Sequence, residues 1–147
     1  MLEGYLKEIK INYEKGDTTE PSFYEILKSL LVKYSEKFLN YKIDVRILPK
    51  KTEAGNPDLK ILNDKNEIVG YIEVKDLTIE NLDKIEDSEQ LKRYQDAFPN
   101  LILTNLFEFR LYRDGKLIDK VEIGRPFDVF QLKTIYVSDS KKENFYK

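Results

Sequence analysis

Apolar residues recur along this chain with two different periods, and the change of period separates helices from strands. In residues 18–40 the apolar positions 23, 27, 30, 31, 34 and 38 follow the 3.6-residue period of a helix packed on a core. Residues 1–15 have a weaker helical spacing and predict an N-terminal arm whose docking the pattern leaves open. From residue 41 apolar and polar positions alternate, which predicts a half-buried strand over residues 41–49.

The start of the main helix has two readings. A threonine of the pair Thr18–Thr19 caps the helix, with the following proline in its first turn. Alternatively, Ser22 is the cap and Glu25, three residues further on, completes a capping box. In both readings Glu20 lies at the amino-terminal mouth of the helix.

The rest of the chain reads as two hairpins separated by a helix and a strand. In order, the pattern predicts a strand over 58–62, a turn at 64–66, a strand over 68–75, a helix over 88–98, a strand over 100–105, and a hairpin over 106–124 that turns at Asp114-Gly115. This order of elements predicts an α/β fold, with helices packed against a central mixed sheet.

Length and composition indicate one folded domain. The chain has 147 residues, of which 41% are hydrophobic and 35% charged. We divide it into an N-terminal arm (1–17), a core (18–117), and a C-terminal strand and tail (118–147). The first residues lack the apolar core of a signal peptide, and no apolar run is long enough to span a membrane, so we expect a soluble cytoplasmic protein.

The absence of histidine and cysteine restricts the available chemistry. Without them the chain has neither a zinc cluster nor the usual base for neutral pH, so catalysis must use carboxylates, lysine, hydroxyl groups or a hard cation. The formal net charge of −2 creates no overall attraction to nucleic acid, although a local basic patch can still bind phosphate.

The first hairpin carries three charged residues that converge. Side chains alternate along a strand, so Glu73 and Lys75 lie on one face. With a turn around Lys65, the two arms pair at residue numbers that add up to about 130, which places Asp58 within one strand spacing of Glu73. Two adjacent carboxylates repel each other, and a divalent cation would relieve that repulsion. Oxygen ligands of this kind suit Mg²⁺, with Mn²⁺ as a substitute.

The same residues resemble a known nuclease motif. Pro57-Asp58 followed by Glu73-Val74-Lys75 is similar to the PD-(D/E)xK pattern. The strings "TEPSFYEIL", "GNPDLKI", "VGYIEVKDL" and "NLDKIEDSEQLKRYQDAFPNLILTNLFEFRLYRDGK" extend the resemblance over residues 19–117. They resemble the N-terminal endonuclease domain of single-polypeptide restriction-modification enzymes of the type ISP and type IIG-like classes, in which the nuclease is linked to an N6-adenine methyltransferase. The resemblance implies a restriction-endonuclease-like fold.

The resemblance assigns roles to the hairpin residues. Asp58 and Glu73 would be metal ligands together with the Val74 carbonyl, and Lys75 would be the catalytic lysine. Glu20 matches an acid that completes the metal shell in the family.

The resemblance also points to the helix over 88–98. Gln90 and Tyr94 match a QxxxY motif, and their spacing places both on one helix face, where they would support the site or contact DNA. Lys92 and Arg93 are basic residues of the same helix, and they would line the path of the DNA phosphates.

Each of these positions also has an ordinary structural reading. Glu20 can be a first-turn acid favoured by the helix dipole. Gln90 and Tyr94 fit an ordinary amphipathic helix, and Lys92 and Arg93 fit a solvated surface. The Glu73–Lys75 pair alone fits an exposed ion pair of a hairpin. The surrounding strings favour the functional reading.

The expected function is that of a Mg²⁺-dependent endonuclease domain that hydrolyses double-stranded DNA as the cleavage module of a restriction-modification enzyme. The chain is too short for a methyltransferase or a target-recognition domain, so it is either an excised domain, with these expected in a longer parent, or a free-standing relative. A double-strand break would require a second copy. The alternatives are a catalytically silent DNA-binding or docking module with the same fold, and a nuclease that acts on RNA or on repair intermediates.

Overall fold

The computed structural model describes residues 1–16 and 20–125 and contains a six-stranded mixed sheet with helices on both faces. The strands lie in the sheet in chain order, β1-β2-β3-β4-β5-β6, and only the β3–β4 pair is parallel. The elements are α1 (Leu2–Glu14), α2 (Glu20–Phe38), β1 (Asp44–Ile47), β2 (Leu59–Leu62), β3 (Ile68–Val74), α3 (Asp83–Glu86), α4 (Glu89–Ala97), β4 (Asn100–Thr104), β5 (Glu108–Arg113) and β6 (Lys116–Glu122). This order confirms the predicted α/β architecture, to which α3 is an addition.

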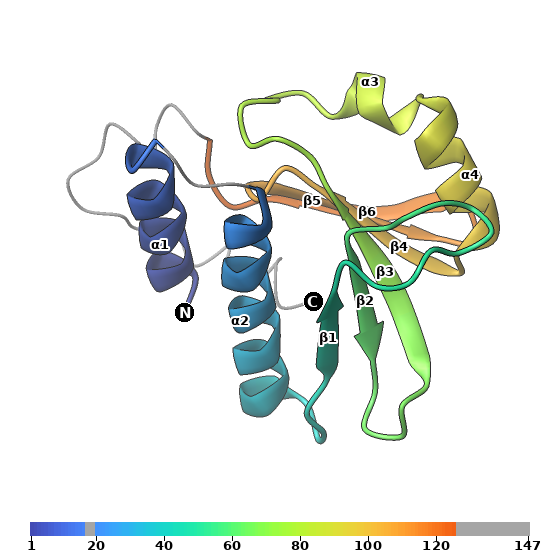
Figure 1. Ribbon diagram of the computed structural model, residues 1–147, viewed down its shortest axis with the longest axis horizontal. Coiled ribbons are helices and arrows are strands. Elements are labelled where there is room, and N and C mark those ends of the chain that lie inside the picture. The colour runs from blue at the N-terminus through green and yellow to red at the C-terminus, as the bar shows by residue number, and fades with distance from the viewer. Residues whose placement is uncertain (17–19, 126–147) are drawn as a thin grey trace.

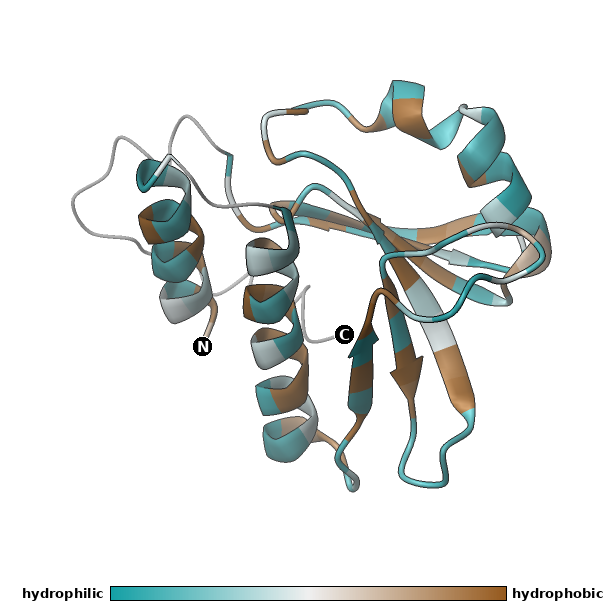
Figure 2. Cartoon of the chain, in the orientation of Figure 1, coloured by the Kyte–Doolittle hydropathy of each residue, from teal (hydrophilic) through white to brown (hydrophobic). Residues whose placement is uncertain are grey.

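Helices cover both faces of the sheet (Figure 1), and a hydrophobic cluster lies on each face. The larger cluster joins α1 and α2 to Ile72 and Val74 of β3, while the smaller joins α4 to Leu101 and Leu103 of β4. Apolar and polar residues alternate along α2 and along the strands (Figure 2), as expected for elements that bury one face or stripe. The sheet is therefore the middle layer of three, and side chains of β3 reach both layers.

The N-terminal segment, whose docking the sequence left open, is the helix α1, and it packs against α2 as part of the larger cluster. Leu2, Leu6 and Ile9 are fully buried, and each such side chain contributes about 1.5–3 kcal/mol to folding. The Tyr5 hydroxyl donates a hydrogen bond to the Leu106 carbonyl at 2.8 Å. The first helix is thus joined to the segment that follows β4.

The two hairpins form as the sequence predicts, with turns that their residues explain. In the β2–β3 turn, the Asn63 side chain accepts hydrogen bonds from the amides of Lys65 and Glu67, both at 2.9 Å. In the β5–β6 turn, Asp114 and Gly115 both have positive φ values, 50° and 80°, as a type I′ turn requires. The boundary drawn at residue 117 on the sequence falls inside β6.

The start of α2 settles one of the two readings of its cap. The helix begins at Glu20, so Ser22 lies inside it and the capping-box reading is wrong. Thr18–Thr19, the other candidate cap, lies outside the described residues, as does the tail from residue 126 onward. In the part of the chain that the structure describes, no helix is long and apolar enough to cross a membrane.

Candidate functional site

Asp58 and Glu73 lie side by side where β2 begins and β3 approaches its end. The ladder pairs Leu59 with Ile72, so the next position along each strand sets Asp58 beside Glu73. The Asp58 Oδ2 atom accepts a hydrogen bond from the Val74 backbone amide at 2.8 Å. Strand pairing therefore determines the separation of the two carboxylates, as the sequence argument expected.

Glu73 is an acid in an unfavourable position for its charge. Only 4% of the residue is exposed. Burial, and then the negative charge of Asp58, raise the pKa of the Glu73 carboxyl to about 8, although Lys75 acts in the opposite direction. Its Oε1 atom is buried and has no hydrogen-bond partner among the described residues. A buried oxygen of this kind costs free energy unless a proton or a cation compensates it.

Lys75 links Glu73 to the helix α4. Its Nζ atom donates to Glu73 Oε2 at 3.2 Å and to Gln90 Oε1 at 3.0 Å. The Gln90 amide in turn donates to the Tyr94 hydroxyl at 3.4 Å. The structure thus places Gln90 and Tyr94 behind the lysine, where they hold its ammonium group in one orientation.

Tyr94 is fully buried and also contacts the loop that precedes Asp58. A Cβ atom at Gly55 would lie 3.1 Å from both the Tyr94 ring and its hydroxyl, and Gly55 has a φ of +136°, which other residues rarely adopt. Glycine therefore allows the loop to approach the ring closely, and one tyrosine supports both sides of the site.

Glu20 lies near the carboxylate pair, at the start of α2. Its pKa is raised, first by burial and then by the charges of Asp58 and Asp76, which shows that these acids lie within electrostatic reach. One turn further on, the Tyr24 hydroxyl is hydrogen bonded to the Asp58 and Glu20 side chains. Sequence reasoning missed Tyr24, although its i+4 spacing from Glu20 was a usable signal.

A cavity of about 660 Å³ opens beside Lys75. Its lining combines the site with the end of α1, through Tyr13, Glu20, Lys75, Asp76 and Leu106 among others. Asp76, which the sequence analysis also missed, accepts hydrogen bonds from the amide and hydroxyl of Thr78, and these lower its pKa. The volume falls in the range of small-molecule sites.

The two basic residues of α4 occupy different positions. The Arg93 Nε atom donates to the Ala54 carbonyl at 3.4 Å, so this exposed arginine lies over the loop that leads to Asp58. Lys92 is exposed and lies two residues from Gln90, about 200° around the helix. The structure therefore brings Arg93 toward the site but not Lys92.

The donor set fits a hard divalent cation only in part. Asp58 and Glu73 provide adjacent carboxylate oxygens, and the unpartnered Glu73 Oε1 is the kind of atom that a cation would satisfy. Among residues 1–16 and 20–125, however, no three acidic side chains are close enough together to form a metal-binding cluster. Glu20 is thus a neighbour of the pair and not the third member of a preformed cluster.

Comparison with known proteins supports the fold. No family model and no curated protein matches the chain. The structure resembles one chain of a cryo-EM structure of the DrdV–DNA complex, with a TM-score of 0.62 and 22% sequence identity over 80% of this chain. The present chain spans 12% of the length of that DrdV-complex chain. The six-stranded mixed sheet flanked by helices is consistent with the restriction-endonuclease-like fold expected from the sequence.

Proposed function

We propose that this chain is a Mg²⁺-dependent endonuclease domain that hydrolyses phosphodiester bonds of DNA. The observation that carries the proposal is the convergence of Asp58, Glu73 and Lys75, with one buried Glu73 oxygen left unpartnered and a lysine held by Gln90. Two acids that would otherwise repel each other favour a cation between them, and a fixed ammonium group beside them favours the orientation of a water molecule.

DNA is the substrate that the fold comparison favours. The resembling structure contains DrdV together with DNA, and the present chain corresponds to a small part of one of its chains. We propose that the domain is the cleavage module of a restriction-modification enzyme, with methyltransferase and target-recognition domains in a longer parent. A phosphate would enter through the cavity that Glu20, Val74 and Lys75 line.

The residues of the site have separate roles in the proposed reaction. Asp58, Glu73 and the Val74 carbonyl would hold the cation, with Glu20 as an acidic neighbour of the pair, and the bound cation would stabilise the negative charge that builds up on the phosphate oxygens. Lys75 would orient the attacking water, and Gln90 would keep the ammonium group aimed at it. The water oxygen would attack phosphorus as it releases a proton to solvent, the bond to the 3′ oxygen would break, the leaving oxygen would take a proton from solvent, and the product would keep a 5′-phosphate. Because one such site cuts one strand, a double-strand break requires a second copy.

The proposal is tested by incubating the purified domain with supercoiled plasmid in Mg²⁺ and in Mn²⁺. We expect nicking that is abolished by EDTA and falls strongly in Asp58→Ala and Lys75→Ala. Matched controls are Asp64→Ala, in the exposed β2–β3 turn, and Lys33→Ala, on the exposed side of α2, and both should cleave like the wild type. Equal cleavage by Lys75→Ala and Lys33→Ala would exclude the assigned mechanism.

One observation favours a second candidate function. Because the described residues contain no cluster of three acidic ligands, a catalytically silent DNA-binding or docking module is the alternative. Thermal unfolding with millimolar Mn²⁺ separates the two, since a working site gains stability from the metal and Asp58→Ala loses that gain. Identical responses of wild type and variant would favour the silent module. Cleavage of RNA with duplex DNA left intact would instead change the substrate class.

A further inference from the structure

Lys75 and Gln90, two residues of the proposed site, flank the connection between β3 and α4. It spans residues 76–88, with Lys75 immediately before it and Gln90 two residues after it. The Lys75 Nζ atom and the Gln90 Oε1 atom meet at 3.0 Å, so the path of the connection determines whether this contact forms. A segment of this kind needs anchors on the sheet if the lysine is to keep one orientation.

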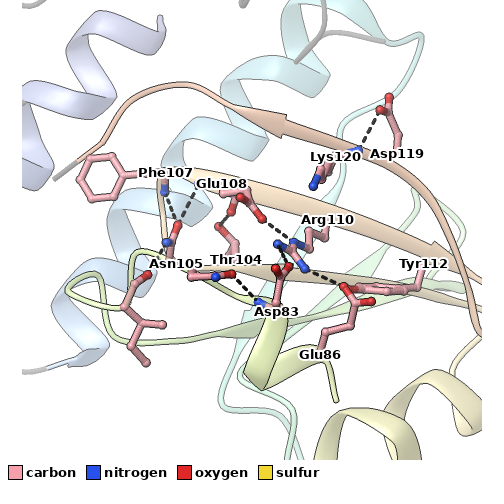
Figure 3. Close-up of polar contacts among 12 residues, drawn as sticks. Asp83, Glu86, Thr104, Asn105, Phe107, Glu108, Arg110, Tyr112, Asp119 and Lys120 are labelled. Atoms are coloured by element: carbon pink, nitrogen blue, oxygen red, sulfur yellow. Dashed lines mark hydrogen bonds and ion pairs between the residues drawn. The ribbon is translucent and has the colours of Figure 1, made fainter. Parts of the chain in front are cut away.

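Arg110 of β5 is the main polar anchor of this connection (Figure 3). Its side chain is 4% exposed and donates from all three of its nitrogen atoms. Its Nη1 donates to Glu86 at 2.6 Å and its Nη2 to Asp83 at 2.7 Å, both in α3, while its Nε donates to Glu108 on its own strand. The Tyr112 hydroxyl adds a second bond to Glu86 Oε2, at 2.6 Å. Glu86 thus receives two bonds from β5.

A second anchor lies nearer to Lys75. The Lys75 amide donates to the Thr104 carbonyl at 2.8 Å, and the buried Asn105 side chain donates to the Ile79 carbonyl at 2.6 Å. Figure 3 shows Thr104 and Asn105 at one end of this row of contacts and Tyr112 at the other. The connection is therefore joined to the sheet on the Lys75 side by β4 and its following turn, and on the Gln90 side by β5.

We propose that Arg110, acting through Glu86, is a positioning residue for the reaction. It fixes α3, and with it the start of α4, so that Gln90 stays within hydrogen-bonding distance of Lys75. Burial of an arginine that pairs with three carboxylates of different exposure is a costly way to attach a short surface helix, and apolar residues stabilise such contacts equally well. The charged contacts of Arg110 with Asp83 and Glu86, the first and last residues of α3, favour a single position of this helix. The catalytic part of this role rests on the proposed function.

Glu86 is a better position for testing the role than Arg110. Without the arginine, Glu108, whose side chain is 14% exposed, would lose its partner and the fold itself would suffer. The Glu86 side chain is 29% exposed, and its removal leaves Arg110 paired with Glu108 and Asp83. Asp87, the exposed neighbour, provides a control of the same charge change.

The first measurement needs no enzymatic activity. Lys75 is acylated with a water-soluble amine reagent and its modification rate is measured by mass spectrometry, with exposed Lys33 as the internal reference. We expect Glu86→Ala to raise the Lys75 rate by about threefold or more, because opening of the connection frees the ammonium group. Glu86→Gln, which keeps an acceptor oxygen for Arg110, and Asp87→Ala should both match the wild type. Equal Lys75 rates in Glu86→Ala and Asp87→Ala would overturn the proposal.

The second measurement follows the metal-dependent nicking of DNA under the same conditions, well below the melting temperature of each variant. We expect Glu86→Ala to lower kcat about tenfold, equivalent to about 1.4 kcal/mol, with little change in KM. Glu86→Gln should have the kcat of the wild type. If the negative charge of Glu86 were what matters, Glu86→Gln would instead lower kcat as Glu86→Ala does. A change confined to KM would contradict the positioning role. If the wild type cleaves nothing, the proposed function fails, while the Lys75 modification rates still decide whether Arg110 positions the lysine.

Discussion

In the absence of divalent metal, the stability of this domain should depend on pH through Glu73. Burial and the charge of Asp58 raise the pKa of this carboxyl to about 8, from the 4.5 expected in an unfolded chain. Between these two pH values the folded protein holds a proton that the unfolded protein has released. The free energy of unfolding must therefore fall as pH rises, with full stability below pH 4.5 and the loss complete above about pH 8.

The size of the effect follows from the same two values. Each pH unit over which the folded state alone binds the proton is equivalent to about 1.4 kcal/mol, so the whole interval corresponds to a few kcal/mol. This is a large fraction of the 5–15 kcal/mol that typically stabilises a domain. Because Glu73 is 4% exposed, solvent screening reduces the effect little.

Urea unfolding in EDTA at several pH values between 5 and 9 measures this dependence, with circular dichroism as the signal because the chain has no tryptophan. Glu73→Gln cannot release a proton and should lose most of the slope. Glu25→Gln, on the exposed side of α2, should keep it. If wild type and Glu73→Gln show the same slope, the buried carboxyl is not the cause and the electrostatic account of the site is wrong.

Two further predictions concern the supports of the site. Gly55→Ala should lower the free energy of unfolding by about 1–3 kcal/mol, because its Cβ would lie 3.1 Å from Tyr94 and its φ is +136°. The control Gly4→Ala, in an exposed helical position with open space, should be neutral or stabilising. Chemical denaturation measures both variants. Tyr24→Phe removes the hydroxyl bonded to Asp58 and should weaken Mn²⁺ binding about tenfold by calorimetry, and an unchanged affinity would show that this bond does not support the ligand.

The fold was accessible from the sequence because its local signals agree. The alternation of Ile72 and Val74 with Glu73 predicts which β3 side chains enter the larger cluster, and the structure confirms this division. The predicted hairpin register is observed next to the turn, where Leu62 lies opposite Ile68, but a bulge between Ile61 and Leu62 shifts it by one, so that Leu59 lies opposite Ile72. That small difference matters, because the observed register sets Asp58 directly beside Glu73.

The long-range contacts were beyond the reach of the sequence. Tyr24 is bonded to Asp58 across 34 positions, and no periodicity of either segment indicates which face of α2 meets the start of β2. Arg110 reads as one polar residue in an alternating strand, and its partners in α3 are 24 and 27 positions away. Such pairs depend on how the helices are placed on the sheet, which local patterns do not specify.

The partial metal-binding character of the site has a consequence for how cation and substrate would bind. Two carboxylates and a carbonyl would leave about half of the six positions around Mg²⁺ to water and phosphate oxygens, and the described residues contain no third clustered acid to occupy another. A phosphate in the cavity beside Lys75 would supply such an oxygen, and the Lys75 ammonium group would balance its negative charge, because the two carboxylates already balance the charge of the cation. Binding of metal and of DNA would then be reciprocal, each raising the affinity for the other by the same factor. The unpartnered Glu73 oxygen is then a ligand atom whose burial is unfavourable without metal. Its burial becomes favourable when a cation and a substrate phosphate are both bound.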